Sequence, residues 1–212
     1  MVFLGRRLNN EEFVEEAMGI MFAGSGTTSS TLTYLLYAIS RPENRAVQER
    51  LREEIQSTTD QIDAIRNLPY LNAVIKETFR LYPTIISTLP RTLDEPLTLE
   101  GYILPAGTII SMQNFVHHRD RAIFADPDFF LPERWLESTK EMEAALTPFG
   151  IEPRSCIGQN LAWEELYIAI SVVLNRVALS LGEEMREEDM EMEDRFNIAP
   201  KGKKLMLKVV SI

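Results

Sequence analysis

The sequence predicts a mainly α-helical fold with small β-sheets. Three stretches of the chain, residues 10–39, 71–82 and 161–181, repeat apolar residues at helical spacing. Between them, residues 97–112 alternate apolar and polar residues around glycine and proline, a pattern typical of short strands joined by turns. We therefore expect helices to form the body of the molecule and the strands to form a minor sheet.

The first helix is expected to begin near Asn10, a capping residue followed by acidic residues, and to end near Ile39, before Pro42. We expect its apolar faces to be buried; they are formed by Phe13, Ala17, Met21, Leu32 and Leu35.

Glycines and hydroxyls interrupt this helix at Ala23-Gly24-Ser25-Gly26-Thr27-Thr28. A glycine inside a helix costs about 1 kcal/mol relative to alanine, so its presence calls for a reason. Close approach of a flat ligand to the helix is one such reason. The alternative is a helix kink in which the hydroxyls bond back to carbonyls of their own helix.

The second helix is expected over residues 71–82, and Pro83 stops it. Glu77 and Arg80 then share one face of the helix. Taken alone, such a pair is usually a solvated surface contact worth about a few tenths of a kcal/mol.

The chain's single cysteine, Cys156, lies in the loop 148–158, which leads directly into the third apolar stretch. A thiolate is a strong, soft donor for iron, and a loop before a helix offers backbone N–H groups and a positive dipole end that stabilise its charge. Arg154 adds a cation nearby. The alternative is a buried cysteine that behaves as a small hydrophobic residue.

Residues 161–181 are expected to form a buried helix after this loop. They do not predict a membrane span, because they carry Glu164, Glu165, Asn175 and Arg176. No stretch of the chain reads as a signal peptide or a transmembrane segment.

The composition is that of a globular protein with a sizeable core: 212 residues, 45% hydrophobic and 25% charged. A formal net charge of -10 argues against nonspecific nucleic-acid binding, which needs clustered cations to replace counterions. One cysteine permits no internal disulfide and fits a reducing compartment.

Phe149, Arg154, Cys156 and Gly158 resemble, in type and spacing, the haem-binding motif of the cytochrome P-450 family. Three further segments resemble the same family and occur in the family's order, so the resemblance runs from about Asn10 to the C-terminus. These segments are residues 23–28, 76–83 and 129–135. The connecting residues are most similar to fungal members that oxidise secondary metabolites.

The resemblance implies the C-terminal half of the cytochrome P-450 fold: a long distal helix, a Glu-x-x-Arg helix, a meander, the cysteine haem loop, a following helix and a C-terminal β-hairpin. Family members run to roughly twice this length, within the range of large single-core proteins. Residues 1–212 are thus expected to form a single partial domain, without the N-terminal half and the membrane anchor with which eukaryotic members usually begin.

The implied cofactor is a b-type haem (heme b), with Cys156 as the axial ligand to its iron. By the family pattern Phe149 packs on the thiolate side, Arg154 pairs with a propionate and Gly158 permits close approach of the next helix. Arg91, in a stretch resembling one that passes beside the haem, is a second propionate candidate; a surface cation is the alternative interpretation.

The family pattern also assigns the distal helix and a buried network. Ala23 and Gly24 make room over the haem, while Thr27, with Thr28 beside it, manages protons. Glu77, Arg80 and Arg134 form a buried Glu-Arg-Arg network that fixes the geometry of the haem loop and adds little net stability.

Residues in two other segments are expected to touch an apolar substrate: Ile85, Ile86, Ser87, Phe196 and Ile198. Ordinary core packing is the alternative for the isoleucines. His117 and His118 are adjacent, so we expect polar anchors in a turn and not metal ligands, which a helix usually presents four residues apart.

Two positions depart from the family pattern. Glu152 stands where the family usually has glycine, whose backbone freedom a side chain lacks, so this loop is expected to carry strain or to turn differently. Gly26 stands where the family has Asp or Glu, so the usual carboxylate of the proton relay is absent. Hydroxyls and water would then carry protons, or the chemistry would need fewer of them.

The function implied by the resemblance is insertion of one oxygen atom from O2 into an apolar small molecule, with electrons from an NADPH-dependent reductase. The alternatives are an inactive, truncated remnant and a haem-thiolate isomerase or dehydratase that needs no external electrons. From the resemblance we expect a location in the cytosol or on the cytosolic face of the endoplasmic reticulum.

Overall fold

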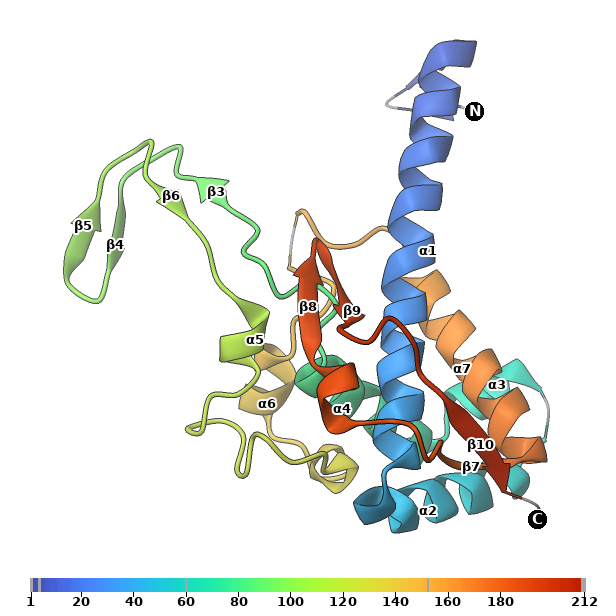
Figure 1. The fold of residues 1–212 in the computed structure, drawn as a ribbon. Coiled ribbons are helices and arrows are strands. Elements are labelled where there is room, and N and C mark those ends of the chain that lie inside the picture. Colours follow the sequence, from blue (N-terminus) through green and yellow to red (C-terminus); the bar gives the residue numbers. More distant parts are fainter. Residues whose placement is uncertain (1, 4, 60, 152, 211–212) are drawn as a thin grey trace.

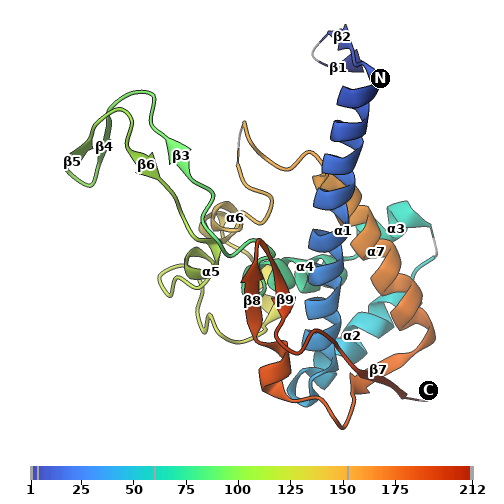
Figure 2. The ribbon, with the colours of Figure 1, turned by 45° about the horizontal axis from the view of Figure 1, so that its top comes forward.

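Helices form the body of the molecule in the computed structural model, which describes residues 2–3, 5–59, 61–151 and 153–210. The long helix α1 (Asn10–Ser40) packs against α2 (Arg45–Gln56), α4 (Pro69–Leu81) and α7 (Gln159–Arg176), and α3 (Ile62–Arg66) packs on α7. Figure 1 shows α4 passing behind the C-terminal half of α1 and α7 lying beside α1, and Figure 2 shows the same helices from a second side. The mainly helical fold predicted from the sequence is confirmed.

The start of α1 is fixed by a reciprocal cap one residue earlier than predicted. The Asn9 side chain accepts the Glu12 N–H at 3.0 Å, and the Glu12 carboxylate accepts the Asn9 N–H at 3.0 Å. This capping box satisfies two backbone donors that a helix start otherwise leaves unpaired. The helix then ends at Ser40, before the short 3₁₀ turn η1 (Pro42–Asn44).

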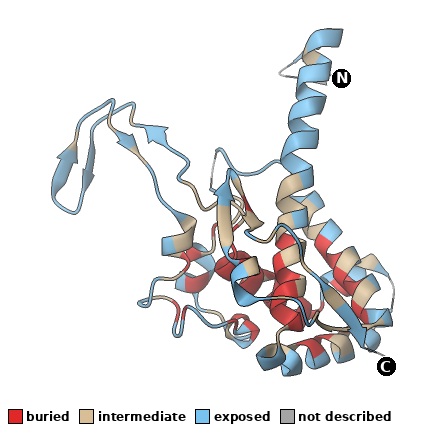
Figure 3. Ribbon diagram, viewed as in Figure 1, coloured by how far each residue is buried: buried red, intermediate tan, exposed pale blue. Residues whose placement is uncertain are grey.

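The two halves of α1 differ in burial. Tyr34, Leu35 and Ile39 are fully buried in the main core, which also contains Leu71, Val74, Ile75 and Phe79 of α4. The expectation that Phe13, Ala17 and Met21 are buried is wrong: all three are exposed. Figure 3 shows that this half of α1 rises beyond the core, so no described element covers it.

The α4 helix confirms the second predicted helix and is held at both ends. Pro69 occupies its first turn, where a missing N–H is harmless, and the Glu54 carboxylate of α2 accepts the N–H groups of Tyr70 and Leu71 at 2.8 Å each. Tyr82 caps its C-terminus before Pro83. This buried, capped helix carries Glu77 and Arg80 into the interior.

Small antiparallel strand pairs surround the helices, as predicted. The pairs are β1 (Val2–Phe3) with β2 (Arg6–Arg7), β3 (Arg91–Thr92) with β6 (Ile109–Ile110), β4 (Leu97–Leu99) with β5 (Tyr102–Leu104), β7 (Ala178–Leu181) with β10 (Leu207–Val210), and β8 (Met192–Arg195) with β9 (Asn197–Pro200). The arm that holds β3 to β6 extends away from the helices (Figure 1). Its turn at Glu100 and Gly101 has φ of 49° and 82°, the left-handed conformation that glycine tolerates best.

The third predicted helix is shorter than expected. It ends at Arg176, Val177 is extended, and residues 178–181 form strand β7, which pairs with β10. The apolar pattern of residues 178–181 is compatible with a helix, but their pairing with β10 makes them a strand. Among the described residues, no helix is both long enough and apolar enough to cross a bilayer.

The segment between β6 and α7 contains three short helical elements: α5 (Asn114–His117), the 3₁₀ turn η2 (Pro132–Trp135) and α6 (Lys140–Ala145). The remaining 3₁₀ turn, η3 (Glu187–Met190), precedes β8. In Figure 1, α5 and α6 lie beside the C-terminal end of α4. The segment that contains them therefore packs near α4 before the chain continues into the cysteine loop.

Candidate functional site

The cysteine loop places the thiol of Cys156 at the surface, immediately before α7. Its backbone N–H donates to the carbonyl of Phe149 at 2.8 Å, which closes the loop into a ring. Gly150 turns the chain with a φ of 71°. A Cβ added at Gly158, the cap residue of α7, would lie 3.8 Å from Cys156 Sγ, so the sulfur rests against the start of the helix.

Phe149 fixes this loop to the core. Its ring meets Phe79 of α4 edge to face at 5.1 Å between centroids, and Phe79 meets Trp163 of α7 in the same way at 5.2 Å. Aromatic pairs of this geometry add about 0.5–1.5 kcal/mol to the burial of their area. The loop is therefore seated on both helices while its sulfur stays accessible.

Apolar side chains stand exposed on both sides of Cys156. Ile157 is 97% exposed, and Ile151 and Leu161 are also largely exposed. Exposed large hydrophobic side chains that cluster in one place mark a surface that a ligand or a partner covers. The chain thus places exposed apolar side chains before and after the cysteine, which suits a flat, apolar molecule.

The two predicted propionate partners are exposed cations. Arg154 makes no hydrogen bond or ion pair with the residues that the structure describes. Among the same residues, the guanidinium of Arg91 in β3 donates to the carbonyls of Leu89 and Pro90, at 3.3 and 3.0 Å. Arginine presents several N–H donors in a fork that matches a carboxylate. Both side chains are therefore available to an anionic group. Glu152, in the same loop, lies outside the described residues.

The structure brings Glu77, Arg80 and Arg134 together. Arg80 donates Nε and Nη2 to the two carboxylate oxygens of Glu77 at 2.8 Å each, and Arg134 Nε donates to Oε1 at 3.2 Å. The Glu77 and Arg80 side chains are fully buried. The pair is thus an internal one and not the solvated surface contact that the spacing alone would favour.

Two further donors complete the surroundings of Glu77, and sequence reasoning missed both. The indole Nε1 of Trp135 donates to Oε2 at 2.8 Å, and the Leu131 N–H donates to Oε1 at 2.9 Å. Arg80 also donates to the carbonyls of His118, Pro127 and Phe129 at 2.6–3.0 Å. A buried ion pair is tolerated only when its remaining donors and acceptors are satisfied, as they are here.

On the distal helix the hydroxyls bond back to their own helix, as one of the two interpretations proposed. Thr27 Oγ1 donates to the Ala23 carbonyl at 2.8 Å, and Ser25 Oγ donates to the Met21 carbonyl at 2.9 Å. The helix nevertheless runs without a break from Asn10 to Ser40. Thr28, one residue further on, is partly buried.

The two glycines of this segment have different surroundings. A Cβ added at Gly24 would meet nothing within 4 Å, whereas one added at Gly26 would lie 3.2 Å from Oδ1 and 3.3 Å from Nδ2 of Asn197. Gly26 therefore allows strand β9 to approach α1 closely. For Gly24 the described chain supplies no close neighbour, and the open space suits a ligand.

The predicted substrate residues lie in two segments that pack together on α1. The Ile198 N–H donates to the Thr84 carbonyl at 2.8 Å, Ser30 Oγ donates to the Ile198 carbonyl at 2.8 Å, and the Thr31 and Thr84 hydroxyls are 2.8 Å apart. These bonds join the segment 84–87 and β9 to α1. Sequence reasoning missed Ser30, Thr31 and Thr84, although a run of hydroxyls follows Thr27.

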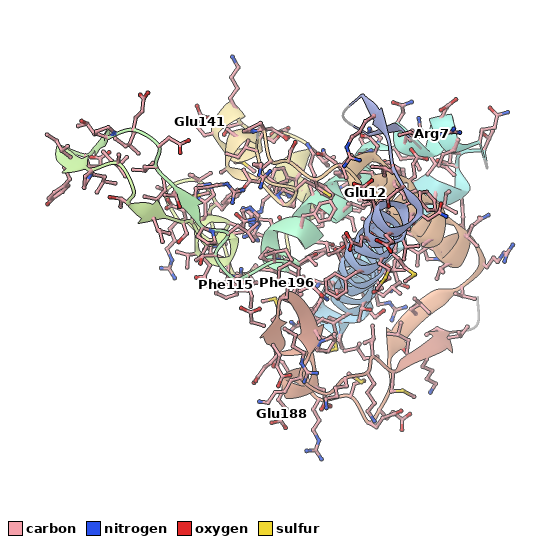
Figure 4. All side chains as sticks on the ribbon, turned by 90° about the horizontal axis from the view of Figure 1, so that it is seen from above. Arg7, Glu12, Phe115, Glu141, Glu188 and Phe196 are labelled. Atoms are coloured by element: carbon pink, nitrogen blue, oxygen red, sulfur yellow. The ribbon has the colours of Figure 1, made fainter. Side chains whose placement is uncertain are left out.

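The predicted substrate residues differ in how far they are exposed to solvent. Ile85, Ile86 and Ser87 are partly buried, and Phe196 (Figure 4) is exposed at the β8–β9 turn. The centroid of its ring lies 6.3 Å from that of Phe22. The Ile198 side chain is fully buried in the core. In this arrangement Ile198 packs within the core and offers no surface to a ligand, because β9 lies directly on α1.

His118 is fully buried, and its Nε2 accepts the Thr147 N–H at 3.1 Å. Burial lowers the pKa of His118 to about 4, and the neighbouring His117 acts in the same direction. The imidazole is therefore neutral near pH 7. A neutral, hydrogen-bonded ring matches the polar anchor predicted for this position.

These residues fit a haem. A haem-thiolate site needs an accessible thiol, apolar groups for the macrocycle and cations for the propionates. Cys156, the exposed apolar side chains beside it and the two arginines supply this set. The space next to Gly24 is open as well.

Comparison with known proteins gives the same family. The family model for cytochrome P-450 matches residues 4–208. The cytochrome P-450 monooxygenase orf2 of Aspergillus niger is 41% identical over 191 residues, covering 87% of this chain and 39% of that protein. The monooxygenase azaI of the same species is 38% identical over 212 residues, 87% of this chain and 45% of that protein.

The similarity extends beyond fungi. The mitochondrial 1,25-dihydroxyvitamin D(3) 24-hydroxylase of Mus musculus is 38% identical over 175 residues, 80% of this chain and 34% of that protein. The chain thus spans less than half the length of the curated relatives it matches. Nearly all of its residues fall within the family model, so the chain belongs to the cytochrome P-450 family.

Proposed function

We propose that this chain forms the haem-thiolate portion of a monooxygenase that inserts one oxygen atom from O2 into an apolar small molecule. The observation that carries the proposal is the accessible Cys156 thiol on a loop seated on α4 and α7. Fungal relatives named as monooxygenases support this activity. A substrate of secondary metabolism is proposed from the resemblance of the connecting residues to fungal members. Electrons would come from an NADPH-dependent reductase, the usual source for the family.

Each predicted residue has a defined task in this proposal. Cys156 Sγ would hold the haem iron, and Arg154 and Arg91 would bind the propionates. Phe149 keeps the loop on the core while the sulfur faces outward. When bound, the haem supplies the oxidation of the substrate, and the thiolate donates electron density to it.

Protons would be managed by hydroxyls of α1. Thr27 Oγ1 already donates its proton to the Ala23 carbonyl, which leaves its lone pairs free to accept a bond from a ligand. Thr28 and Ser25 offer two more hydroxyls on the same segment. Gly26 carries no side chain, so in this proposal the hydroxyls take the place of a carboxylate.

Residues 1–212 are proposed to act as one partial domain, with substrate contacts at Ile85, Ile86, Ser87 and Phe196. The bonds from Ser30 and Thr31 that tie these segments to α1 support a shared role. The buried position of Ile198 suits a support beneath them.

The test of the proposal is the absorption spectrum of the purified chain, supplied with haem and reduced under carbon monoxide. We expect the red-shifted band of thiolate ligation, and its loss in Cys156→Ser with the fold intact. A chain that stays colourless, or a serine variant with an unaltered spectrum, would contradict the proposal.

Gly26 favours a second candidate, a haem-thiolate isomerase or dehydratase. Rearrangement of a substrate needs no external electrons and so less proton delivery than oxygen insertion. Turnover that persists without NADPH and reductase would identify this activity. The third candidate is an inactive remnant, which would bind no haem.

A further inference from the structure

Asn114 of α5 and His118, the residue after α5, hold the entrance to the cysteine loop by bonding every polar atom of Thr147. Its N–H donates to His118 Nε2 at 3.1 Å, its carbonyl accepts Asn114 Nδ2 at 3.1 Å, and its Oγ1 donates to Asn114 Oδ1 at 3.2 Å. His118 is fully buried and Thr147 is nearly so. Three bonds to one buried residue fix both its position and its orientation.

The same histidine is tied to the buried charges of α4. Arg80 Nη1 donates to the His118 carbonyl at 2.9 Å, and the Arg80 side chain is held by Glu77 at 2.8 Å. His118 therefore receives one bond from the network through its backbone and accepts another from the loop through its ring. No other described residue bonds both to Arg80 and to Thr147.

From Thr147 the hydrogen bonds continue to the cysteine. The Thr147 carbonyl accepts the Gly150 N–H at 3.1 Å, and the carbonyl of Phe149, two residues after Thr147, accepts the Cys156 N–H at 2.8 Å. A displacement of Thr147 would thus move both ends of the loop. The order of contacts runs from α4 through α5 to the sulfur-bearing residue.

We propose that Asn114 and His118 are positioning residues of the cysteine loop, which hold Thr147 in register with the buried Glu77–Arg80 pair and thereby set the place of the Cys156 sulfur. This inference rests on the proposed function for its haem readout. Its structural part, the anchoring of Thr147, can be measured without haem.

The experiment compares His118→Leu, which removes the acceptor, with His118→Gln, whose amide oxygen reaches about as far as Nε2. His117→Leu is the control, since His117 is adjacent, only partly buried and makes no side-chain hydrogen bond within the described chain. The first readout is amide hydrogen exchange in the haem-free chain. We expect exchange at Thr147 to be about tenfold faster in His118→Leu, while Ile75 in the core is unchanged and His118→Gln is close to wild type.

The second readout is the fraction of bound haem that shows the thiolate band under carbon monoxide. We expect this fraction to fall in His118→Leu and to be restored in His118→Gln. A merely structural role would lower total haem and stability while leaving that fraction unchanged. Unchanged Thr147 exchange, or an unchanged thiolate fraction, would overturn the proposal.

Two outcomes need separate treatment. If His118→Leu also accelerates exchange at Ile75, the chain has unfolded. In that case the test compares Thr147→Val, which loses only the hydroxyl bond to Asn114, with Thr147→Ser, which keeps it. The valine variant must then lower the thiolate fraction and the serine variant must not. If the wild type binds no haem, the proposed function fails, and Thr147 exchange still decides the anchoring.

Discussion

The Glu77 side chain is the buried anion at the centre of the network with Arg80, Arg134 and Trp135. Its fully buried carboxylate accepts five hydrogen bonds from described residues, four from side chains and one from the Leu131 N–H. Removing one partner of a buried ion pair leaves the other without compensation, and this costs far more than the intact pair contributes.

Replacement of Glu77 by alanine is therefore expected to lower the free energy of unfolding by about 3–5 kcal/mol. Arg80 would stay buried without an anion, and the indole N–H of Trp135 would lose its acceptor. Urea denaturation measures the effect, and loss of haem incorporation should accompany it. Glu143→Ala is the control, because the Lys76–Glu143 pair is partly exposed and worth about 0–1 kcal/mol. Equal effects of the two variants would show that Glu77 matters no more to stability than a surface carboxylate.

At the scale of elements, the β8–β9 hairpin packs on α1 at Gly26, where a larger residue would meet the Asn197 side chain. The hairpin turns at Phe196, whose φ is 78°, and places Asn197 against the glycine. Ser30 then holds the Ile198 carbonyl at 2.8 Å. The close approach of the Asn197 side chain thus explains a glycine that is intrinsically unfavourable in a helix.

The two glycines of α1 allow a matched test of this contact. Gly24→Ala should stabilise the chain by up to about 1 kcal/mol, because alanine favours the helix and the new methyl group meets open space. Gly26→Ala should gain less or destabilise, since Asn197 must move. Thermal unfolding of Gly26→Ala, Asn197→Ala and the double variant measures the coupling. Additive effects would show that the hairpin does not press on Gly26.

At the scale of the whole molecule, the core lies around the C-terminal half of α1, and the cysteine loop stands at its edge (Figure 3). His118 connects the core to the loop through its bonds with Arg80 and Thr147, and it is buried in its neutral form. Its pKa is lowered by burial, by His117 and by Arg80, while the backbone carbonyls of Phe79 and Arg80 oppose the shift.

This burial predicts a pH dependence of global stability. The folded pKa of about 4 lies below the ordinary value of 6.5, so the unfolded chain binds a proton first as the pH falls. The contribution is complete above about pH 6.5 and is lost as the pH falls through about 4, for a total of about 3 kcal/mol. We expect the free energy of unfolding in urea, measured from about pH 4 to 7, to rise with pH more steeply in the wild type than in His118→Gln, because glutamine does not titrate. Parallel curves would show that His118 does not titrate in this way.

Much of the fold followed from local pattern. The helices over residues 10–39 and 71–82 were predictable because an amphipathic period and stop residues are local features, and the short strands around residue 101 were predictable from their turn. The Glu77–Arg80–Arg134 contact was predictable because a family resemblance supplied the third member. The exposed half of α1 was not, because periodicity shows which face is apolar and not what covers it.

The contacts missed from the sequence are those between distant segments. Nothing local indicates that Trp135 donates to Glu77, that Thr147 binds His118 or that Asn197 faces Gly26, because each joins residues at least 29 positions apart. Residues 178–181 were predicted to be helical but form a strand. The prediction failed because pairing with residues 207–210, which are distant in sequence, decides their conformation. The roles assigned to the site residues stay predictions until the haem experiments are made.

The solitary, accessible sulfur of Cys156 also makes the chain chemically addressable at a single point. A maleimide dye can attach at one place only, within the loop that α5 anchors. Iron bound to that sulfur would shield it from alkylation, so the fraction of chains that takes up the dye reports the fraction with a free thiol. The feature that defines the proposed chemistry is thus also a built-in reporter of its assembly.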